Sequence, residues 1–487
     1  MLWLVYSSAV ILFSISFFLL RIIKTSGDII SAALFSVELL TNHLLSDEQK
    51  QKKIQHLALK MAQQFFLLML KIIVLAISVL VPFYGADSLG FVDFSESTAF
   101  AMRIDIIVVT TIIALMVYFF WQNIFTKQET LNESSSTETA YSNLERVIHN
   151  IAFGSANLQR TLNDIEVKYF SRKWIAARAS KPVFITSLPR AGTTILLEAM
   201  SRLPNMASHT YRDMPFIFSP VLWAKISSTF QNKSDMKERA HGDGLLVNED
   251  SPEAFEEVLW HKFFPQKYQQ NRIQLWQKAD DRFLKFFHEY TKRIIYLRLP
   301  DALQKGRYLS KNNANIARIP VLKEMFPDCA IVVPVRDPFE HAISLHRQHL
   351  NFQKKHYGES FTKKYMADIG HFEFGELHRP INFPELDTLI ADLKPESCDY
   401  WLAYWIAAFS HLQTVDSVIF VSYEALCVDG ENTLVNLCKQ LAIDASPQQI
   451  KTAAQLLKGA PTRKQDYVFS ETLSQRARHL YQQLLVQ

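Results

Sequence analysis

The stretch that decides the fold is residues 183–194, Val-Phe-Ile-Thr-Ser-Leu-Pro-Arg-Ala-Gly-Thr-Thr, followed by a helix-compatible run over 195–200. A β-branched and aromatic run, a turn with Pro and Gly, and that second run predict strand, loop and helix. Because the loop ends where the helix begins, its N–H groups and the helix dipole point at one spot, which favours an anion. Arg190 adds a permanent charge there, and Thr193 and Thr194 add hydroxyls. These residues predict a phosphate-binding loop; the alternative is a plain strand-to-helix turn that contains a glycine.

The rest of the chain is long and close to neutral. Its 487 residues are too many for one ordinary domain, and the net charge of +4 does not indicate a nucleic-acid partner. The four cysteines form no Cys-x-x-Cys pair, so there is no zinc signature. Cysteines this few and scattered suit a reducing compartment, where thiols serve as small apolar residues.

Three apolar runs in the N-terminal part are long enough to cross a bilayer, which takes about 20 residues per helix. They predict transmembrane helices at about 1–23, 65–84 and 104–125. The first run has no basic segment before it and no clear cleavage site, so we interpret it as an uncleaved helix rather than a secretion signal. The alternative for the second run is a buried helix of a soluble domain.

The charges between these runs predict the orientation in the membrane. Residues 21–62 carry six Lys or Arg, whereas 85–102 carry none. Because basic loops stay on the cytoplasmic side, we expect an integral protein of the bacterial inner membrane with its N-terminus outside and its catalytic domain in the cytoplasm. The stretch 29–45 has helical spacing and could lie along the membrane surface.

The chain is expected to divide into three parts: a transmembrane region at 1–128, a polar linker at 129–140 and a globular domain at 141–487. Within the domain, further strands are predicted at 307–310, 330–335 and 418–423. Helical patterns separate them, and Ser251-Pro252-Glu253 predicts one helix start, with Ser as N-cap. Short buried strands alternating with helices predict an α/β fold, a P-loop-type three-layer domain with a mostly parallel sheet.

The loop at 183–194 differs from the ATP and GTP loop, Gly-x4-Gly-Lys-Ser/Thr. Aligned on Gly192, Ser187 stands at the first Gly and Thr193 at the Lys. The missing Lys argues against a kinase or NTPase. The motif Pro-Arg-Ala-Gly-Thr-Thr instead resembles the first nucleotide-binding loop of the sulfotransferase family, commonly Pro-Arg-Ser-Gly-Thr-Thr. The one departure, Ala191, removes a hydroxyl donor but no backbone donor.

A second motif carries the resemblance further. A predicted strand delivers Arg336 to its C-terminal end, Pro338 starts a helix, and Ser344 lies about two turns along it. An Arg with a helix-borne Ser makes an anion clamp; the alternative for an Arg-Asp-Pro turn alone is an ordinary helix start. In sulfotransferases this Arg and Ser hold the 3′-phosphate of the donor PAPS (3′-phosphoadenosine 5′-phosphosulfate). Many relatives carry another Arg further along the helix, for which Arg347 and Gln348 are the candidates.

Two shorter matches complete the resemblance, which covers residues 180–465 and looks most like the bacterial, carbohydrate-type branch. Lys311 ends a predicted strand, as in some Golgi sulfotransferases, where such a Lys contacts the transferring group. Tyr423 and Glu424 are similar to a segment that lies near the nucleotide in that family.

The resemblance implies which residues bind PAPS and which carry the chemistry. The implied donor-binding residues are Arg190, Ala191, Gly192, Thr193, Thr194, Arg336, Ser344 and Tyr423. Lys311 would stabilise the charge that develops on the leaving group. The base that activates the acceptor hydroxyl is left open among Asp213, His241 and His209, with Asp213 and His241 as the favoured pair. No metal is implied, because a sulfuryl group carries less charge than a phosphoryl group.

These expectations predict a membrane-anchored sulfotransferase that moves a sulfuryl group from PAPS to an acceptor hydroxyl on a glycan or glycolipid. Two alternatives stay open: another P-loop nucleotide-dependent transferase or kinase, and a non-catalytic membrane scaffold with a degenerate P-loop domain. The histidines at 341, 346 and 349 follow Arg336 on one predicted helix. Because no acidic or Cys partner accompanies them, we interpret them as a solvated or acceptor-lining face rather than a metal site.

Overall fold

The computed structural model describes residues 1–21, 25, 47–103, 106, 149–150, 152–154, 156–227, 237–238, 246–247, 251–253, 255–269, 271–358, 360–457 and 467–486. The predicted linker at 129–140, the stretch 29–45 and His241 lie outside the described residues. The predicted span at 104–125 also lies outside them, apart from Ile106.

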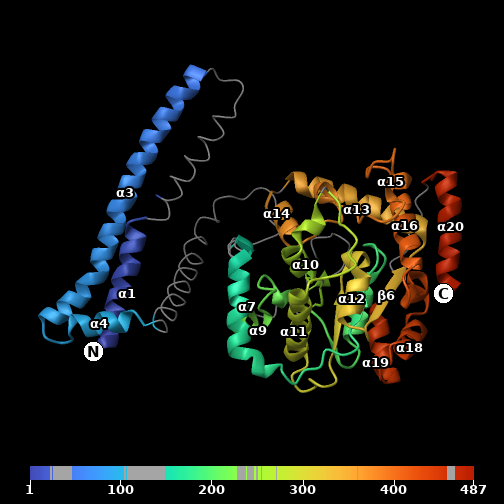
Figure 1. Ribbon diagram of the computed structural model, residues 1–487, viewed down its shortest axis with the longest axis horizontal. Helices are drawn as coiled ribbons and strands as arrows, with labels where there is room; N and C mark the ends of the chain where they lie inside the picture. Colours follow the sequence, from blue (N-terminus) through green and yellow to red (C-terminus); the bar gives the residue numbers. More distant parts are fainter. Residues whose placement is uncertain are drawn as a thin grey trace. The chain divides into compact units, whose positions relative to one another are not determined.

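The chain forms two compact units, Met1–Glu138 and Thr139–Gln487. In the first unit, α1 (Leu2–Leu19) packs against α3 (Asp47–Ser88), and the short helix α4 (Phe94–Ala101) contacts both (Figure 1). A small apolar cluster joins the three helices; its buried members are Val5, Tyr6, Ala9, Phe83, Ala86, Val92 and Ile106.

Within the described residues, α3 is the helix that is long and apolar enough to cross a membrane. Its segment Leu57–Ser88 meets that test by length and composition, and no part of its most apolar window is buried. The helix predicted at 65–84 lies inside this segment. The apolar part of α1, Leu2–Phe17, is shorter. Both helices therefore have the apolar composition that the sequence predicted, and of the two the α3 segment has the length of a span.

The second unit is built on a five-stranded parallel sheet with the strand order β2-β5-β1-β6-β7. The strands are β1 (Val183–Ile185), β2 (Met206–Ala207), β5 (Arg307–Lys311), β6 (Ala330–Val335) and β7 (Val418–Ser422). A two-stranded antiparallel ribbon, β3 (Lys237–Glu238) and β4 (Leu246–Val247), stands apart from this sheet. The parallel sheet confirms the predicted α/β fold class.

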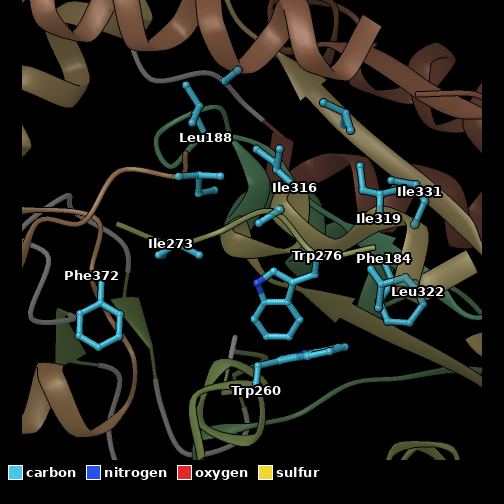
Figure 2. Packing of buried hydrophobic residues seen from close by; sticks show 14 of the residues in the cluster. Phe184, Leu188, Trp260, Ile273, Trp276, Ile316, Ile319, Leu322, Ile331 and Phe372 are labelled. Carbon is cyan, nitrogen blue, oxygen red and sulfur yellow. The ribbon is translucent and has the colours of Figure 1, made fainter. Parts of the chain in front are cut away.

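Alternating residues of the central strands enter two separate cores, one on each face of the sheet. Phe184 packs with Tyr308 and Ile331 in one core, while Val183 and Ile185 enter the other. Figure 2 shows part of the first core, where the rings of Trp260 and Trp276 lie next to each other and Phe184 lies near Leu322. Strands that are buried on both faces have continuous apolar sequences, which is why these strands could be predicted from the sequence.

Helices cover both faces and make three layers. The face with Phe184 is covered by α10 (Glu257–Phe263), α11 (Asp281–Arg298), α12 (Ile319–Met325), α13 (Pro338–Gly358), α16 (Cys398–Gln413) and α20 (Glu471–Val486). The opposite face is covered by α8 (Thr193–Ser201), α17 (Tyr423–Val428), α18 (Gly430–Gln440) and α19 (Pro447–Ala454). At the periphery lie α7 (Ala156–Phe170), α9 (Pro220–Ser227), α14 (Ser360–Asp368) and α15 (Leu386–Leu389) (Figure 1).

Side-chain caps explain several of the helix starts. Ser397 begins α16 by accepting a hydrogen bond from the N–H of Asp399. Asp280 begins α11 by accepting one from the N–H of Phe283. Ser446 forms a capping box at α19, with Pro at the first helical position. Each cap satisfies N–H groups that have no partner inside the helix, which is worth about 1 kcal/mol per cap.

The helix start predicted at Ser251 is wrong. Pro252 forms an antiparallel bridge with Thr210, and the N–H of Glu253 donates to the carbonyl of His209. These bonds hold the segment extended, so helix α10 begins at Glu257 instead. Tertiary pairing has overridden a favourable local capping pattern, and the shift places the Glu253 side chain next to the functional site.

Candidate active site

Several of the predicted site residues lie at the carboxyl edge of the sheet, around β1. This strand lies between β5 and β6, and its last residue, Ile185, is in register with Lys311 on one side and Val332 on the other. The chain leaves β1 for β2 and β5 on one side of it and then continues with β6 and β7 on the other side, so β1 marks a topological switch point. Ligands of parallel α/β sheets bind at such a point, beyond the carboxyl ends of the strands.

The loop after β1 is fastened to both neighbouring strands. The Ser187 hydroxyl donates to the carbonyl of Pro334 at 2.8 Å, and the Thr186 hydroxyl donates to the carbonyl of Asn313 at 3.3 Å. Arg190 and Gly192 adopt left-handed backbone conformations, with φ of 72° and 88°. Helix α8 then begins at Thr193. The loop therefore presents a helix N-terminus at a fixed position on the sheet edge, which suits an anion.

Tyr423 closes one side of this loop. A Cβ atom added to Gly192 would lie 2.5 Å from Cδ2 of the Tyr423 ring, so the ring rests directly on the glycine. The guanidinium carbon of Arg336 lies 5.0 Å from the centre of the same ring. The Tyr423 ring therefore contacts both Gly192 of the loop at 183–194 and Arg336, and so links the two predicted anion-binding motifs.

Arg190, Arg336 and Ser344 come together as the sequence predicted. Nε of Arg190 lies 3.4 Å from the Ser344 hydroxyl, and Nη1 of Arg336 donates to the Arg190 carbonyl at 3.2 Å. Glu340 lies 3.8 Å from Nη2 of Arg336. Arg347 is exposed and Gln348 is buried on the same helix. Two guanidinium groups that follow neighbouring strands and a hydroxyl of α13 form a cationic site with planar, multidentate donors.

A carboxylate network supports this site from the far side. Glu424 accepts hydrogen bonds from the N–H of Asp337 at 2.9 Å and from the Tyr481 hydroxyl at 2.9 Å. Asp337 in turn caps α13 through the N–H groups of Phe339 and Glu340. The C-terminal helix α20 is thereby tied to the residue that follows Arg336.

His341 fixes the loop from inside. Its side chain is fully buried, and its Nε2 lies 2.8 Å from the Pro189 carbonyl. Burial lowers its pKa to about 3, so the ring is neutral near pH 7 and its Nε2–H donates to that carbonyl. His349 is buried as well, and Nε2 of the half-buried His346 lies 2.7 Å from the Glu396 carbonyl. A solvated position is therefore wrong for His341 and His349, which are buried beside α16, while the alternative of an acceptor-lining face stays a prediction. Among the described residues, no group of three or more His, Cys, Asp or Glu is placed to hold a metal ion.

Asp213 lies in a buried ion pair with Arg298. Both of its carboxylate oxygens contact Nη2 of Arg298, and Oδ2 also accepts from the N–H of Thr210. Burial alone would raise its pKa, but Arg298 and His209 outweigh that effect and hold the pKa well below its usual range. A carboxylate this acidic and this fully engaged is suited to holding the chain at 210–213, and it is poorly suited to taking a proton.

Lys311 lies beside a carboxylate that the sequence had assigned to a helix start. Nζ of Lys311 is 3.8 Å from Oε1 of Glu253, and the Tyr211 hydroxyl donates to Oε2 of Glu253 at 2.8 Å. Both side chains of the Lys311–Glu253 pair are about nine-tenths buried. The signal that identified Lys311, a strand followed by a polar turn, has no counterpart for Glu253, whose place depends on its pairing with the His209 segment.

Buried polar groups make the end of β5 rigid. The hydroxyls of Tyr308 and Ser310 both donate to Glu256, which is fully buried. Asn312 donates to Glu257 at 2.8 Å, and the Thr193 hydroxyl donates to the Asn313 side chain at 3.3 Å. Such second contacts hold a functional side chain such as Lys311 in one place relative to the loop.

Comparison with known proteins fits this geometry. The sequence profile of the sulfotransferase family matches residues 182–447, which is more than half of the chain. No curated protein sequence matches the chain.

Similar solved structures are sulfotransferases of bacteria. Sulfotransferase STF1 from Mycobacterium tuberculosis H37Rv is 14% identical, covers 65% of this chain and 82% of its own, and has a TM-score of 0.37. STF9 from Mycobacterium avium is 11% identical, with 66% and 78% covered and a TM-score of 0.38. The sulfotransferase domain of the Synechococcus PCC 7002 olefin synthase is 14% identical, with 64% and 98% covered and a TM-score of 0.29. The profile match spans the loop at 183–194, Lys311 and the Arg336–Ser344 clamp, and the chain belongs to the sulfotransferase family.

Proposed function

We propose that the unit Thr139–Gln487 transfers a sulfuryl group from PAPS to a hydroxyl of a glycan or glycolipid acceptor. The observation that carries the proposal is the pairing of Arg190 with Arg336 and Ser344 at the switch point of the sheet. PAPS carries anionic groups at both its 5′ and 3′ positions, so it needs two adjoining sets of donors. One set would be the N–H groups and hydroxyls of the loop together with Arg190, and the other the clamp of Arg336 and Ser344, which Arg190 contacts.

The residues at this edge have the chemistry that such a donor requires. The loop N–H groups, Arg190, Thr193 and Thr194 are suited to the 5′-phosphosulfate, because they combine a helix N-terminus with a charged donor. Ala191 and Gly192 contribute backbone N–H groups, and the contact of Gly192 with Tyr423 leaves no room there for a Cβ. Tyr423 presents a flat ring beside the clamp, where it can face a nucleoside.

Lys311 and Glu253 are the residues we propose for the chemistry. PAPS supplies the sulfuryl group and leaves as the 3′,5′-bisphosphate PAP, which takes both electrons of the broken S–O bond. Lys311 stabilises the negative charge that builds on the departing phosphate oxygen. Glu253 takes the proton of the acceptor hydroxyl as its oxygen bonds to sulfur. Removing one donor aimed at such a charge costs about 2.7–4 kcal/mol of barrier.

Glu253 is a better candidate for the base than Asp213 on physical grounds. It lies beside Lys311 and accepts from Tyr211, while Asp213 is committed to Arg298. His241, the other predicted base, stays a prediction. The Glu253→Gln variant of the full chain should lose about 10²–10⁴-fold in kcat with an unchanged Kd for PAP. The Asp213→Asn variant should instead lose stability by about 3–5 kcal/mol, because Arg298 is left without its partner. An Asp213→Asn protein that is fully stable yet inactive would reverse the assignment.

The donor proposal is tested by release of PAP. Purified full-length protein with labelled PAPS should form PAP only when an acceptor is present. Arg190→Ala and Arg336→Ala should each lower kcat/KM by about 10²–10³-fold. The matched control is Arg476→Ala, which removes an exposed Arg that pairs with Glu385 far from the site. Transfer that is unchanged in Arg190→Ala would refute the proposed donor site.

The remaining alternatives give different results in binding assays. A P-loop kinase would be stabilised against heat by ATP, whereas the proposed enzyme would be stabilised by PAPS and PAP. A non-catalytic scaffold would bind PAP but modify none of a panel of oligosaccharide and glycolipid acceptors. The glycolipid option is supported by the apolar segment Leu57–Ser88, which would hold the enzyme close to lipid-linked substrates.

A further inference from the structure

One surface of the unit Thr139–Gln487 combines exposed apolar side chains with crowded cations. It is formed by the end of α7, the 3₁₀ turn η1 (Ser171–Lys173) with the residues after it, and the end of α9; we call it the α7 surface. Helices α7 and α9 lie next to each other (Figure 1). Its apolar side chains include Tyr169, Ile175 and Ile226, which are 68%, 76% and 48% exposed. Ile165, one turn before Tyr169 on α7, is 39% exposed.

The cations of the α7 surface stand close together. Nζ of Lys225 lies 4.4 Å and Nζ of Lys173 5.8 Å from the centre of the Phe170 ring. Partial desolvation and the charge of Lys173 both lower the pKa of Lys225. Lys168 and Arg172 are exposed on the same segment. Like charges crowded this way repel one another, so an anionic partner would relieve the repulsion.

Few acidic groups oppose these cations. Glu166 on α7 is fully buried and pairs with Arg293. Glu289 already binds Lys292 and the indole N–H of Trp174. Asp164 is the exposed acid on this part of α7. The net charge of the side chains on the α7 surface is therefore strongly positive.

The surface is held rigid from below. Oε2 of Glu166 accepts from the N–H of Leu222 at 2.6 Å, which ties α7 to α9. Trp174 is buried, and the guanidinium carbon of Arg293 lies 5.3 Å from its ring centre. The exposed apolar and cationic groups are therefore presented together on a fixed base, and binding would not have to order them first.

We propose that the α7 surface docks onto the anionic phospholipid headgroups of a bilayer. Exposed Tyr and Ile side chains beside Lys and Arg are the composition that binds the interface of anionic membranes. Each Lys or Arg near such a surface contributes about 1 kcal/mol, so the four cations named above give modest affinity alone. The same chain carries the apolar segment Leu57–Ser88, and anchoring by that segment would raise the effective concentration of lipid at the α7 surface. The docked unit would then work close to the membrane plane.

The test compares neutral and anionic membranes with the full-length chain. The protein is reconstituted into nanodiscs of phosphatidylcholine alone or with 30% phosphatidylglycerol, and amide hydrogen exchange is followed by mass spectrometry. Peptides covering 171–180 should exchange at least 3-fold more slowly in the anionic discs at 50 mM NaCl. The protection should disappear at 0.5 M NaCl, because salt screens exposed charges. Equal exchange in both kinds of disc would overturn the proposal.

Variants distinguish docking by the α7 surface from a general effect of the protein's net charge. Lys173→Glu with Lys225→Glu should abolish the protection, and Ile175→Ser should reduce it. The control pair, Lys439→Glu with Lys451→Glu, changes exposed lysines of α18 and α19 by the same charge and should leave the protection intact. Protection that falls equally in the control pair would overturn the proposal, as would protection by RNA or an acidic protein in place of anionic discs. PAP affinity should stay the same in all four proteins, so failure of docking is distinguishable from failure of the proposed function.

Discussion

Gly192 is the residue at which the geometry of the loop is most demanding. Its φ is +88°, and an added Cβ would lie 2.5 Å from the Tyr423 ring. We expect Gly192→Ala to lose about 1–3 kcal/mol of unfolding free energy from backbone strain alone. Displacement of Tyr423 should also raise the Kd for PAP by more than 10-fold. Urea denaturation and calorimetric titration with PAP measure the two effects.

Gly154→Ala is the matched control for that substitution. Gly154 lies in a helical segment, and a Cβ there would meet nothing within 4 Å. Ala is the better helix former by about 1 kcal/mol, so this variant should be as stable as the original chain or slightly more so. Equal losses in both variants would show that Tyr423 does not constrain Gly192.

At the residue scale, the sequence singled out the residues that meet around β1, but it gave no indication of the surroundings of Glu253 and Asp213. Arg190, Gly192 and Arg336 stand in local motifs in which a strand, a turn and a helix start follow one another. Local order of that kind is readable without the fold. The position of Glu253 depends on a hydrogen bond to His209, which is distant in sequence. The ion pair of Asp213 depends on Arg298 at the end of helix α11. Neither contact leaves a local pattern.

Helix α13 carries buried neutral histidines that make the fold sensitive to acid. The pKa of His341 is lowered to about 3 by burial, and that of His349 to about 4, also by burial. Both rings protonate near pH 6.5 in the unfolded chain, so the unfolded state binds more protons below that pH. Stability is therefore full above pH 6.5 and falls as the pH drops toward 4.

We expect His341→Gln to flatten this pH dependence. Between pH 6 and pH 4 the unfolding free energy of the original chain should fall by roughly 1 kcal/mol per pH unit more than that of the variant. Denaturant titrations at several pH values measure the difference. His479→Gln, which changes an exposed histidine of α20, is the control and should keep the original slope. A His341→Gln slope equal to the original would refute the linkage.

Helix α20 is linked to the residue after Arg336 through Glu424. The Tyr481 hydroxyl donates to Glu424, which in turn accepts from the N–H of Asp337 at the start of α13. We expect Tyr481→Phe to cost about 1 kcal/mol of stability and to raise the KM for PAPS several-fold, with kcat unchanged at saturation. Tyr169→Phe, which alters an exposed tyrosine, should change none of these values. A fall in kcat with normal KM would contradict a positioning role for Tyr481.

At the element scale, buried strands were easier to predict than helix starts. The predicted strand at 330–335 has the same bounds as β6. A short β-branched run that is apolar throughout is typical of a strand buried on both faces of a parallel sheet. The capping pattern at Ser251 was equally clear in sequence, yet Pro252 bridges Thr210 instead. Caps are worth about 1 kcal/mol, and tertiary pairing of a short segment is enough to override them.

For the whole molecule, the prediction to test is membrane insertion. The segment Leu57–Ser88 has its apolar side chains largely exposed, and an apolar surface of this extent is stable where lipid covers it. We expect the full chain expressed in bacteria to stay in the membrane pellet after an alkaline carbonate wash. Protease added outside spheroplasts should leave the unit Thr139–Gln487 intact, as the basic loop at 21–62 predicts. Recovery in the carbonate supernatant would contradict insertion.

The parallel sheet also decides when the site can exist during synthesis of the chain. Arg190 and Ser344 are 154 residues apart in sequence, and at about 5–20 residues per second the ribosome needs roughly 8–30 s to make that interval. Until β5 (Arg307–Lys311) has been made, β1 has neither of its neighbouring strands. Tyr481 comes later still, 57 residues after Glu424. The nascent chain therefore carries an unpaired strand for seconds, and the residues that we propose for donor binding are all present only when translation is almost complete.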